Sequence, residues 1–327
     1  MKILATFLLA ALGLACPHSH SADAVSKKKE KARPAKSSQP KPTQADVPYG
    51  PHAQQKLDFY QARSDTPTPL LFFIHGGGWK QGDKSNFNDA APYLAAGVSV
   101  VSINYRHISH AEAEQIVPPV KAPLHDAARA LQFVRSKAAE WNLDKTRIAA
   151  SGSSAGACSS LWLAFHPDMA DPKSDDPVAR QSTRLWCAAV VRAQTSLDPR
   201  QMIEWIPNNI YGFHAFGFKG DAAAQLTPFA EFLAKRDTIL PWIAEYSPYA
   251  LVTADDPPVY LFYDLPPAMG QTQENPAHSA NFGVGLAEKL KSTGLDFELN
   301  HPGATNVKHP DARSYLLEKL KAPAVRN

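Results

Sequence analysis

A serine flanked by two glycines is the first candidate for chemistry in this sequence. Residues 152–156 read Gly-Ser-Ser-Ala-Gly, which matches the pattern G-x-S-x-G with Ser154 at its centre. This pattern occurs where a strand turns sharply into a helix and exposes a nucleophilic serine above a sheet. A short apolar run at 147–150 precedes it and a helical stretch from Ser154 to Phe165 follows it. The sequence therefore predicts an activated serine nucleophile.

A second motif lies upstream, after the apolar run from Leu70 to Ile74. Residues 75–79 read His-Gly-Gly-Gly-Trp. Successive glycines let backbone N–H groups point at a developing oxyanion, where side chains would obstruct the approach. We expect Gly77 and Gly78, together with Ala155 after the serine, to form an oxyanion hole. The segment does not have the G-x-x-x-x-G-K spacing of a phosphate-binding loop.

With these two motifs, and with Asn-Tyr-Arg at 104–106, the sequence resembles the α/β-hydrolase superfamily. It looks like the esterases and lipases with an HGGGW loop, and is similar to the bacterial feruloyl/acetyl-esterase-like hydrolases (BD-FAE-like). The resemblance covers residues 47–320. It implies hydrolysis of carboxylic esters through an acyl-enzyme, with neither a metal nor an organic cofactor. Fold-level analogy suggests acetyl or feruloyl esters of polysaccharides as substrates.

The general base is expected after the last strand, because this class has the chain order Ser, acid, His. Members of the family have a Pro-Gly pair there with a histidine a few residues later. Here Pro302 and Gly303 precede His309, which we predict as the base. His301 is the alternative, since it comes before the turn.

The acid departs from the family's pattern. The resemblance places an aspartate beyond the fifth strand, at a position that Asn275 occupies here. An asparagine can orient a histidine but cannot balance the charge of an imidazolium, and such a change can cost about 10⁴ in turnover. Glu274 is our predicted acid, with Asp264 and Asp198 as alternatives. A weakly active enzyme is the remaining possibility.

These motifs need a framework of alternating strands and helices, and the sequence supplies one. Strands are expected at 70–74, 98–103, 147–150, 185–191, 258–263 and 295–299, with helices at 86–96, 126–141, 154–165, 280–291 and 312–320. This alternation predicts an α/β fold with a doubly wound, mostly parallel sheet. The aromatic, proline-broken stretch at about 193–256 interrupts the rhythm and is predicted as a helical cap insertion.

The N-terminal region is expected to lie outside this fold. Residues 1–24 combine a positive start, a short apolar run and an A-x-A site, so they predict a signal peptide and a secreted or periplasmic protein. Cys16 raises the alternative of a lipid anchor. Residues 25–46 are basic and rich in proline and predict an extended linker. The domain then starts at residue 47.

The remaining composition limits the partners. Beyond residue 41 there are 26 lysines and arginines against 29 aspartates and glutamates, so nothing favours nucleic acid. Cys158 and Cys187 lie in apolar runs and are expected to be buried free thiols. The expected partner is a small ester or an acylated polysaccharide. Two rival functions remain open, a serine peptidase or amidase of the same fold and a weakly active or non-catalytic glycan-binding relative.

Overall fold

The computed structural model describes residues 39–321. The predicted signal peptide, Cys16 and most of the predicted linker lie outside the described residues. The predicted linker end at Asp46 is wrong, because β1 (Gln44–Pro48) is already part of the sheet and pairs antiparallel with β2 (Lys56–Tyr60). The residues of β1 are mostly exposed. Backbone pairing and not burial therefore holds this strand, which is why composition did not indicate it.

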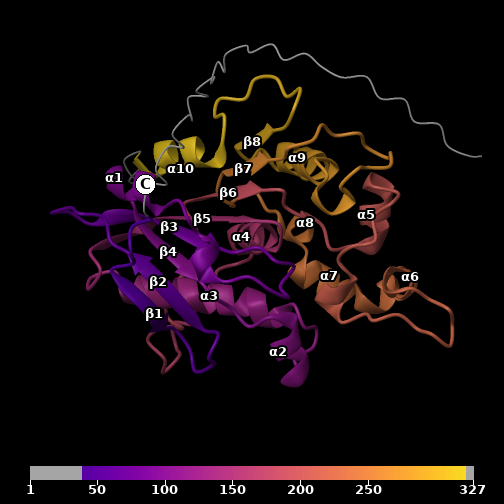
Figure 1. Cartoon of the computed structure of the whole chain (residues 1–327), viewed down its shortest axis with the longest axis horizontal. Coiled ribbons are helices and arrows are strands. Elements are labelled where there is room, and N and C mark those ends of the chain that lie inside the picture. Colours follow the sequence, from indigo (N-terminus) through magenta and orange to yellow (C-terminus); the bar gives the residue numbers. More distant parts are fainter. Residues whose placement is uncertain (1–38, 322–327) are drawn as a thin grey trace, which may run out of the picture. The chain divides into compact units, whose positions relative to one another are not determined.

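Eight strands form one sheet in the order β1-β2-β4-β3-β5-β6-β7-β8 (Figure 1). The six strands from β4 to β8 run parallel, and β2 joins β4 antiparallel. Their bounds are β3 (Thr68–Ile74), β4 (Ser99–Ile103), β5 (Leu143–Ser153), β6 (Cys187–Val191), β7 (Val259–Phe262) and β8 (Phe297–Asn300). The predicted α/β fold with a mostly parallel sheet is confirmed.

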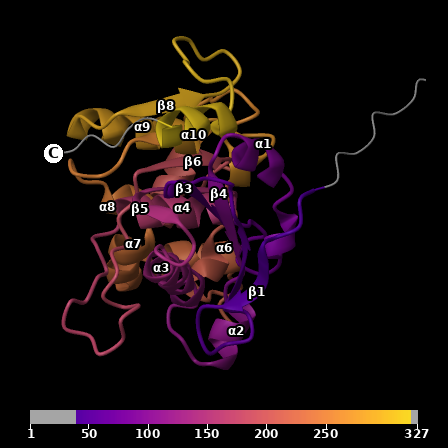
Figure 2. The ribbon, with the colours of Figure 1, turned by 90° about the vertical axis from the view of Figure 1, so that its left-hand side faces the viewer.

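Helices cover both faces of the sheet (Figure 2). One face carries α3 (Lys121–Ser136), α4 (Ala155–Phe165), α8 (Pro248–Leu251) and α9 (Asn281–Thr293). The other face carries α1 (Ala90–Ala95) and α10 (Ala312–Lys321). The amphipathic spacing read from the sequence accounts for α3, in which Ala127, Leu131 and Val134 are buried. Each face therefore has its own hydrophobic core, and the carboxyl ends of the strands stay available for a site.

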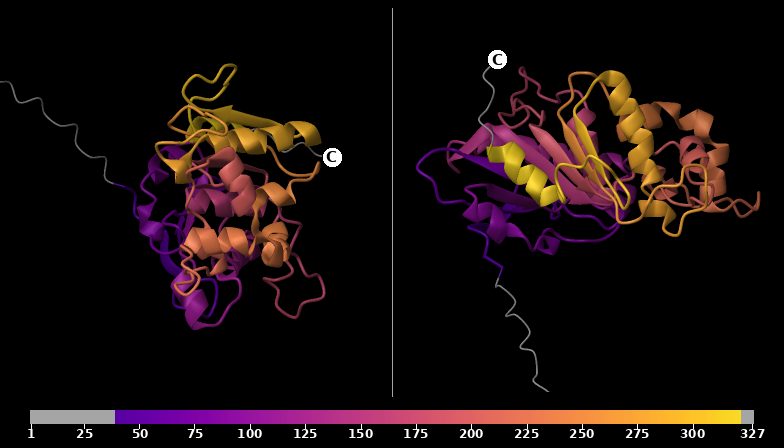
Figure 3. Two further views of the ribbon diagram at one scale, coloured as in Figure 1. Left: turned by 90° about the vertical axis from the view of Figure 1, so that its right-hand side faces the viewer. Right: turned by 90° about the horizontal axis from the view of Figure 1, so that it is seen from above.

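The chain between β6 and β7 is helical. It contains α5 (Pro199–Trp205), α6 (Pro228–Ala234) and α7 (Leu240–Tyr246) before α8, and it lies beyond one end of the sheet (Figure 3). Several of its aromatic side chains, including Phe216 and Phe232, are buried in the larger core. The short helix α2 (Ile108–Ala113) follows β4. The segment between β6 and β7 is packed onto the sheet domain through an apolar interface.

Two further observations concern residues 39–321. None of their helices is both long enough and apolar enough to cross a membrane. Cys158 and Cys187 are free and buried, as predicted.

Candidate active site

Ser154 occupies the turn between β5 and α4. Its backbone has φ 55° and ψ −122°, which is unfavourable for a residue with a side chain. The Ser154 N–H donates to the carbonyl of Val191 on the neighbouring strand, at 3.0 Å. Its own carbonyl accepts from Cys158 in the first turn of α4. The strain therefore persists because hydrogen bonds to β6 and to α4 fix the turn, as the nucleophile elbow of this motif requires.

The two motif glycines allow this turn to approach the end of β3. A Cβ atom built on Gly156 would lie 2.0 Å from the carbonyl oxygen of Ile74, and one on Gly152 would lie 2.5 Å from the same oxygen. The obstructing atoms belong to the backbone of a central strand, which cannot move aside cheaply. Only glycine fits at either position.

Replacing Gly156 by alanine should therefore lower the free energy of unfolding by about 3 kcal/mol or more. The matched control is Gly294→Ala, because Gly294 has φ +74° and no heavy atom within 4 Å of a built Cβ. Its cost should be backbone strain alone, about 1 kcal/mol. Urea denaturation of the three proteins measures both values. Equal losses would show that the approach of α4 to β3 is not close.

The glycine loop after β3 lies directly against the nucleophile. A Cβ on Gly76 would lie 2.6 Å from the Ser153 carbonyl oxygen and 3.5 Å from the Cβ of Ser154. Gly77 and Gly78 have φ +108° and +63°, which favour glycine. Gly77 and Gly78, the residues of this loop that were predicted for the oxyanion hole, line the same cleft as Ser154.

Buried side chains hold the ends of this loop. The Tyr105 hydroxyl donates to the carbonyl of His75 at 2.8 Å, and the Trp79 indole donates to Ser159 Oγ at 3.0 Å. His75 is almost completely buried, and burial lowers its pKa to about 4. It is therefore a neutral, structural histidine at neutral pH.

His278 is the histidine that reaches the nucleophile. Its Nε2 lies 2.9 Å from Ser154 Oγ. It ends the short 3₁₀ turn Pro276–His278, which lies between β7 and α9. The backbone N–H of His278 donates to the carbonyl of Asn275. Burial lowers the pKa of His278, the nearby Arg192 lowers it further, and the charge of Asp264 raises it. An imidazole with a lowered pKa stays neutral, as a general base must.

The structure contradicts the prediction of His309 as the base. Its Nδ1 lies 2.7 Å from Glu298 Oε1 and its Nε2 lies 3.1 Å from Glu318 Oε2, so both ring nitrogens are engaged away from Ser154. His301 also does not reach the serine, and its Nδ1 lies 3.0 Å from the Pro302 carbonyl. His278 was not predicted from the sequence, because the chain order of this class places the base after the last strand and His278 precedes that strand. The one available signal was that His278 lies three residues after the anomalous Asn275.

The three candidate acids lie in different environments. Glu274, the predicted acid, has an exposed side chain, and Asn275 is exposed as well. Asp198 caps α5 by accepting from the N–H of Arg200 and pairs with Arg236 at 2.6 Å. Asp264 follows β7 and pairs with Arg192, and its side chain is exposed as well (43%). It differs from Glu274 in that its charge raises the pKa of His278. The structure therefore favours Asp264 over Glu274.

A cleft of about 620 Å³ opens over Ser154, His278 and the glycine loop. Its lining comprises Gly76, Gly77, Gly78, Lys80, Gln81, Ser153, Ser154, Arg192, Tyr211 and His278. Tyr211 comes from the cap segment, and its hydroxyl would lie 3.0 Å from a Cβ on Gly78. Lys80 and Arg192 are the charged lining residues other than histidine, so the cleft favours negative charge that develops on a bound group. Within residues 39–321, no group of three or more His, Cys, Asp or Glu side chains could hold a metal ion.

A mostly parallel sheet, a strained serine at the strand-to-helix turn and an adjacent glycine loop define an α/β hydrolase. A family profile described as BD-FAE matches residues 57–264, which is more than half of the chain. The protein belongs to the BD-FAE family of carboxylic ester hydrolases. The family resemblance stated from the motifs is confirmed.

Individual relatives are more distant. Carboxylesterase NlhH of Mycobacterium tuberculosis is 35% identical over 100 residues, covering 29% of this chain and 28% of that protein. The chain thus matches less than a third of the length of this curated relative. Esterase 2 of Thermogutta terrifontis, phosphonylated by sarin, has a TM-score of 0.61 and 23% identity, covering 85% of this chain and 93% of that one. An acetyl ester-xyloside bifunctional hydrolase from Caldicellulosiruptor lactoaceticus has a TM-score of 0.56 and 24% identity, covering 75% and 76%. The two structures show a shared fold.

Proposed function

We propose that this protein is a secreted serine esterase that cleaves acetyl or feruloyl esters of polysaccharides. One observation carries the catalytic part of this proposal, namely that His278 Nε2 lies 2.9 Å from Ser154 Oγ beside the glycine loop. A nucleophile within hydrogen-bond reach of a base, next to backbone donors, is the arrangement that acyl transfer needs.

In the proposed reaction His278 takes the proton of Ser154 Oγ as the oxygen attacks the ester carbonyl carbon. The N–H groups of Gly77, Gly78 and Ala155 stabilise the negative charge that forms on the carbonyl oxygen. His278 then gives its proton to the leaving alcohol, which leaves an acyl group on Ser154. Water, deprotonated by His278, then attacks the carbonyl carbon of this acyl group. The bond from that carbon to Ser154 Oγ breaks, His278 returns the proton to Oγ, and the carboxylic acid is released. Throughout, the carboxylate of Asp264 favours the imidazolium form of His278.

The proposed substrate class and location have separate support. Family membership supports acetyl and feruloyl groups, and a protein of the same fold is named an acetyl ester-xyloside hydrolase. The signal-peptide pattern of residues 1–24 supports export. An ester of an extracellular polysaccharide agrees with both the family membership and the signal-peptide pattern.

The pKa of His278 gives a testable pH dependence. Because the pKa is lowered, the neutral base should persist below the ordinary value of about 6.5, and kcat/KM should fall only at more acidic pH. Asp264 raises this pKa, so Asp264→Asn should move the acid limb to still lower pH. Arg192 lowers it, so Arg192→Gln should move the limb upward. Profiles of kcat/KM for the three proteins measure these shifts, and shifts of the opposite sign would exclude His278 as the titrating base.

A set of three probes tests the proposed function itself. The protein without residues 1–24 is assayed with p-nitrophenyl acetate, methyl ferulate and a peptide p-nitroanilide, with Ser154→Ala as the control. The proposal expects turnover of at least one ester that vanishes in the variant, and labelling of Ser154 by an organophosphate. Cleavage of the anilide alone would establish a peptidase or amidase. Failure of both ester turnover and labelling would favour a glycan-binding relative.

A further inference from the structure

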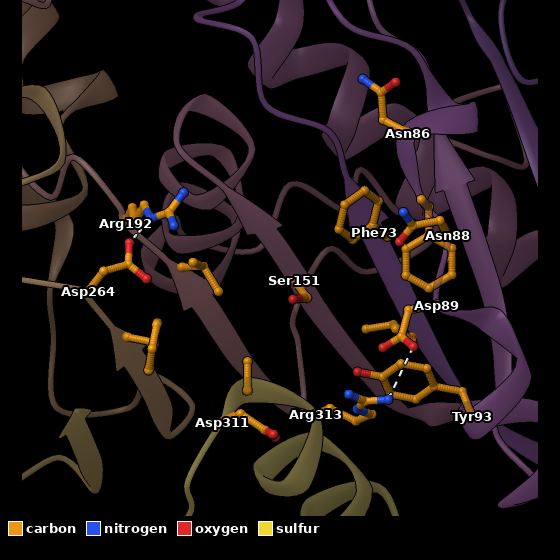
Figure 4. A pocket seen from close by; sticks show the side chains of 15 residues that line it. Phe73, Asn86, Asn88, Asp89, Tyr93, Ser151, Arg192, Asp264, Asp311 and Arg313 are labelled. Atoms are coloured by element: carbon orange, nitrogen blue, oxygen red, sulfur yellow. Dashed lines mark hydrogen bonds and ion pairs between the residues drawn. The ribbon is translucent and has the colours of Figure 1, made fainter. Parts of the chain in front are cut away.

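A second cleft lies beside the catalytic one, on the face of the sheet that carries α1 and α10 (Figure 4). We call it the α1–α10 cleft, and its volume is about 430 Å³. Its floor consists of Leu71 and Phe73 from β3, with Ser151, Val191 and Phe262 from the adjacent strands β5, β6 and β7. Its walls are residues 86–89 with Tyr93 on one side and residues 311–313 on the other.

This cleft and the catalytic cleft meet at one residue. Arg192, directly after β6, lines both of them. Ser151 on the floor comes three residues before Ser154 on the same chain segment. Figure 4 shows Arg192 and Asp264 side by side at the rim, facing each other across their ion pair. The two clefts therefore adjoin at the Arg192 side chain.

The lining combines aromatic rings with charged pairs. Phe73, Phe87 and Phe262 contribute rings, while Arg313 pairs with Asp89 at 3.2 Å and Arg192 pairs with Asp264. An alkyl chain would strip water from these ion pairs without replacing its hydrogen bonds, which is unfavourable. Hydroxyl groups can take the place of that water, and the C–H face of a sugar ring can pack on an aromatic ring. The chemistry of the lining therefore fits a sugar.

The charges also indicate which kind of sugar. Asp89, Asp264 and Asp311 supply three carboxylates, and Arg192 and Arg313 supply two guanidinium groups. Four of these five groups are already paired with each other. No cation is left over to hold a uronic acid, so a neutral sugar is the better match.

We propose that the α1–α10 cleft binds neutral sugar residues of the alcohol part of the ester that Ser154 cleaves. This inference rests on the proposed function and specifies where the polysaccharide chain lies. Asn88 and Arg313 are the side chains best placed to hydrogen bond to it, because Asn88 is exposed and the Arg313 side chain is 45% exposed at the edge of the cleft.

The test compares two esters that differ in their alcohol. Wild type, Asn88→Ala and Arg313→Gln are assayed with a partially acetylated xylo-oligosaccharide and with p-nitrophenyl acetate. Each variant should raise the KM for the oligosaccharide about fivefold relative to the KM for p-nitrophenyl acetate, which is the effect of losing one hydrogen bond. Arg180→Gln is the matched control, because Arg180 is an exposed arginine that lines neither cleft. It should leave the ratio unchanged. The Arg313–Asp89 pair is on the surface, so its loss should not unfold the protein.

Three outcomes would overturn the inference. One is an unchanged KM ratio in both cleft variants, and another is the same change in Arg180→Gln. The third is a change in the preference for feruloyl over acetyl groups on a fixed alcohol, which would assign the cleft to the acyl part. Binding of xylotetraose to the Ser154→Ala protein, measured by calorimetry, separates this inference from the proposed function. If wild type hydrolyses neither ester, weaker xylotetraose binding in Asn88→Ala still supports the cleft, and no binding overturns it.

Discussion

Replacing His278 by glutamine should lower kcat for p-nitrophenyl acetate by about 10⁵-fold or more, about as much as Ser154→Ala. Glutamine keeps a polar side chain of similar reach but cannot accept the proton of Ser154 Oγ and return it to the leaving group. Nucleophile and base act as one unit, so losing either removes nearly the whole effect. Stopped-flow and steady-state assays of the two variants measure both losses.

The control for this prediction is His309→Gln. His309 is bonded to Glu298 and Glu318 and lies away from the serine, so its replacement should change kcat by less than about twofold. It should instead lower the free energy of unfolding by about 1–3 kcal/mol, because buried hydrogen bonds are lost. If His309→Gln abolished turnover and His278→Gln kept it, the geometry found at Ser154 would not be the reacting one.

Asp264→Asn should lower kcat by about 10³- to 10⁴-fold. An amide in place of the carboxylate removes the charge that stabilises the imidazolium of His278, and in related triads this change costs about 10⁴. Asp264 pairs with Arg192 and influences His278 through its charge, so we expect the loss to be at or below that value. Steady-state kinetics at the pH optimum of each protein measures it.

Two variants complete this experiment. Glu274→Gln should leave kcat nearly unchanged, because the carboxylate whose charge acts on His278 is Asp264 and not Glu274. Asp198→Asn should weaken the pair with Arg236 and the cap of α5, which lowers stability and spares kcat. A collapse of kcat in Glu274→Gln together with normal activity in Asp264→Asn would restore Glu274 as the acid.

The sequence predicted those parts of the site that one continuous segment builds. The elbow at Ser154 needs a strand, two glycines and a helix within 147–165, and all of them are visible in the sequence. The loop from His75 to Trp79 is equally local. The buried strands of the parallel sheet can be predicted because each is an apolar run in the sequence. For these elements, the residue types that favour the local conformation are the same as those that the tertiary structure requires.

The base and the acid could not be predicted in this way. They come from turns after β7, and which histidine reaches Ser154 depends on how those turns fold back over the sheet. His278 and His309 are indistinguishable as residue types, and chain order favoured His309, which lies away from Ser154. The first two strands also escaped prediction. β1 is exposed and is recognised only by its pairing with β2, and the short β2 contains the buried charged residue Asp58, which interrupts its apolar run.

The contact of Gly156 with the end of β3 has a consequence for the energetics of catalysis. It joins Ala155, at the start of α4, to Gly77 and Gly78, which follow β3, through backbone atoms that cannot separate without breaking the sheet. The two halves of the oxyanion hole therefore cannot drift apart between turnovers. The proposed oxyanion donors thus keep their separation before a substrate binds, so little reorganisation energy is added to the activation barrier.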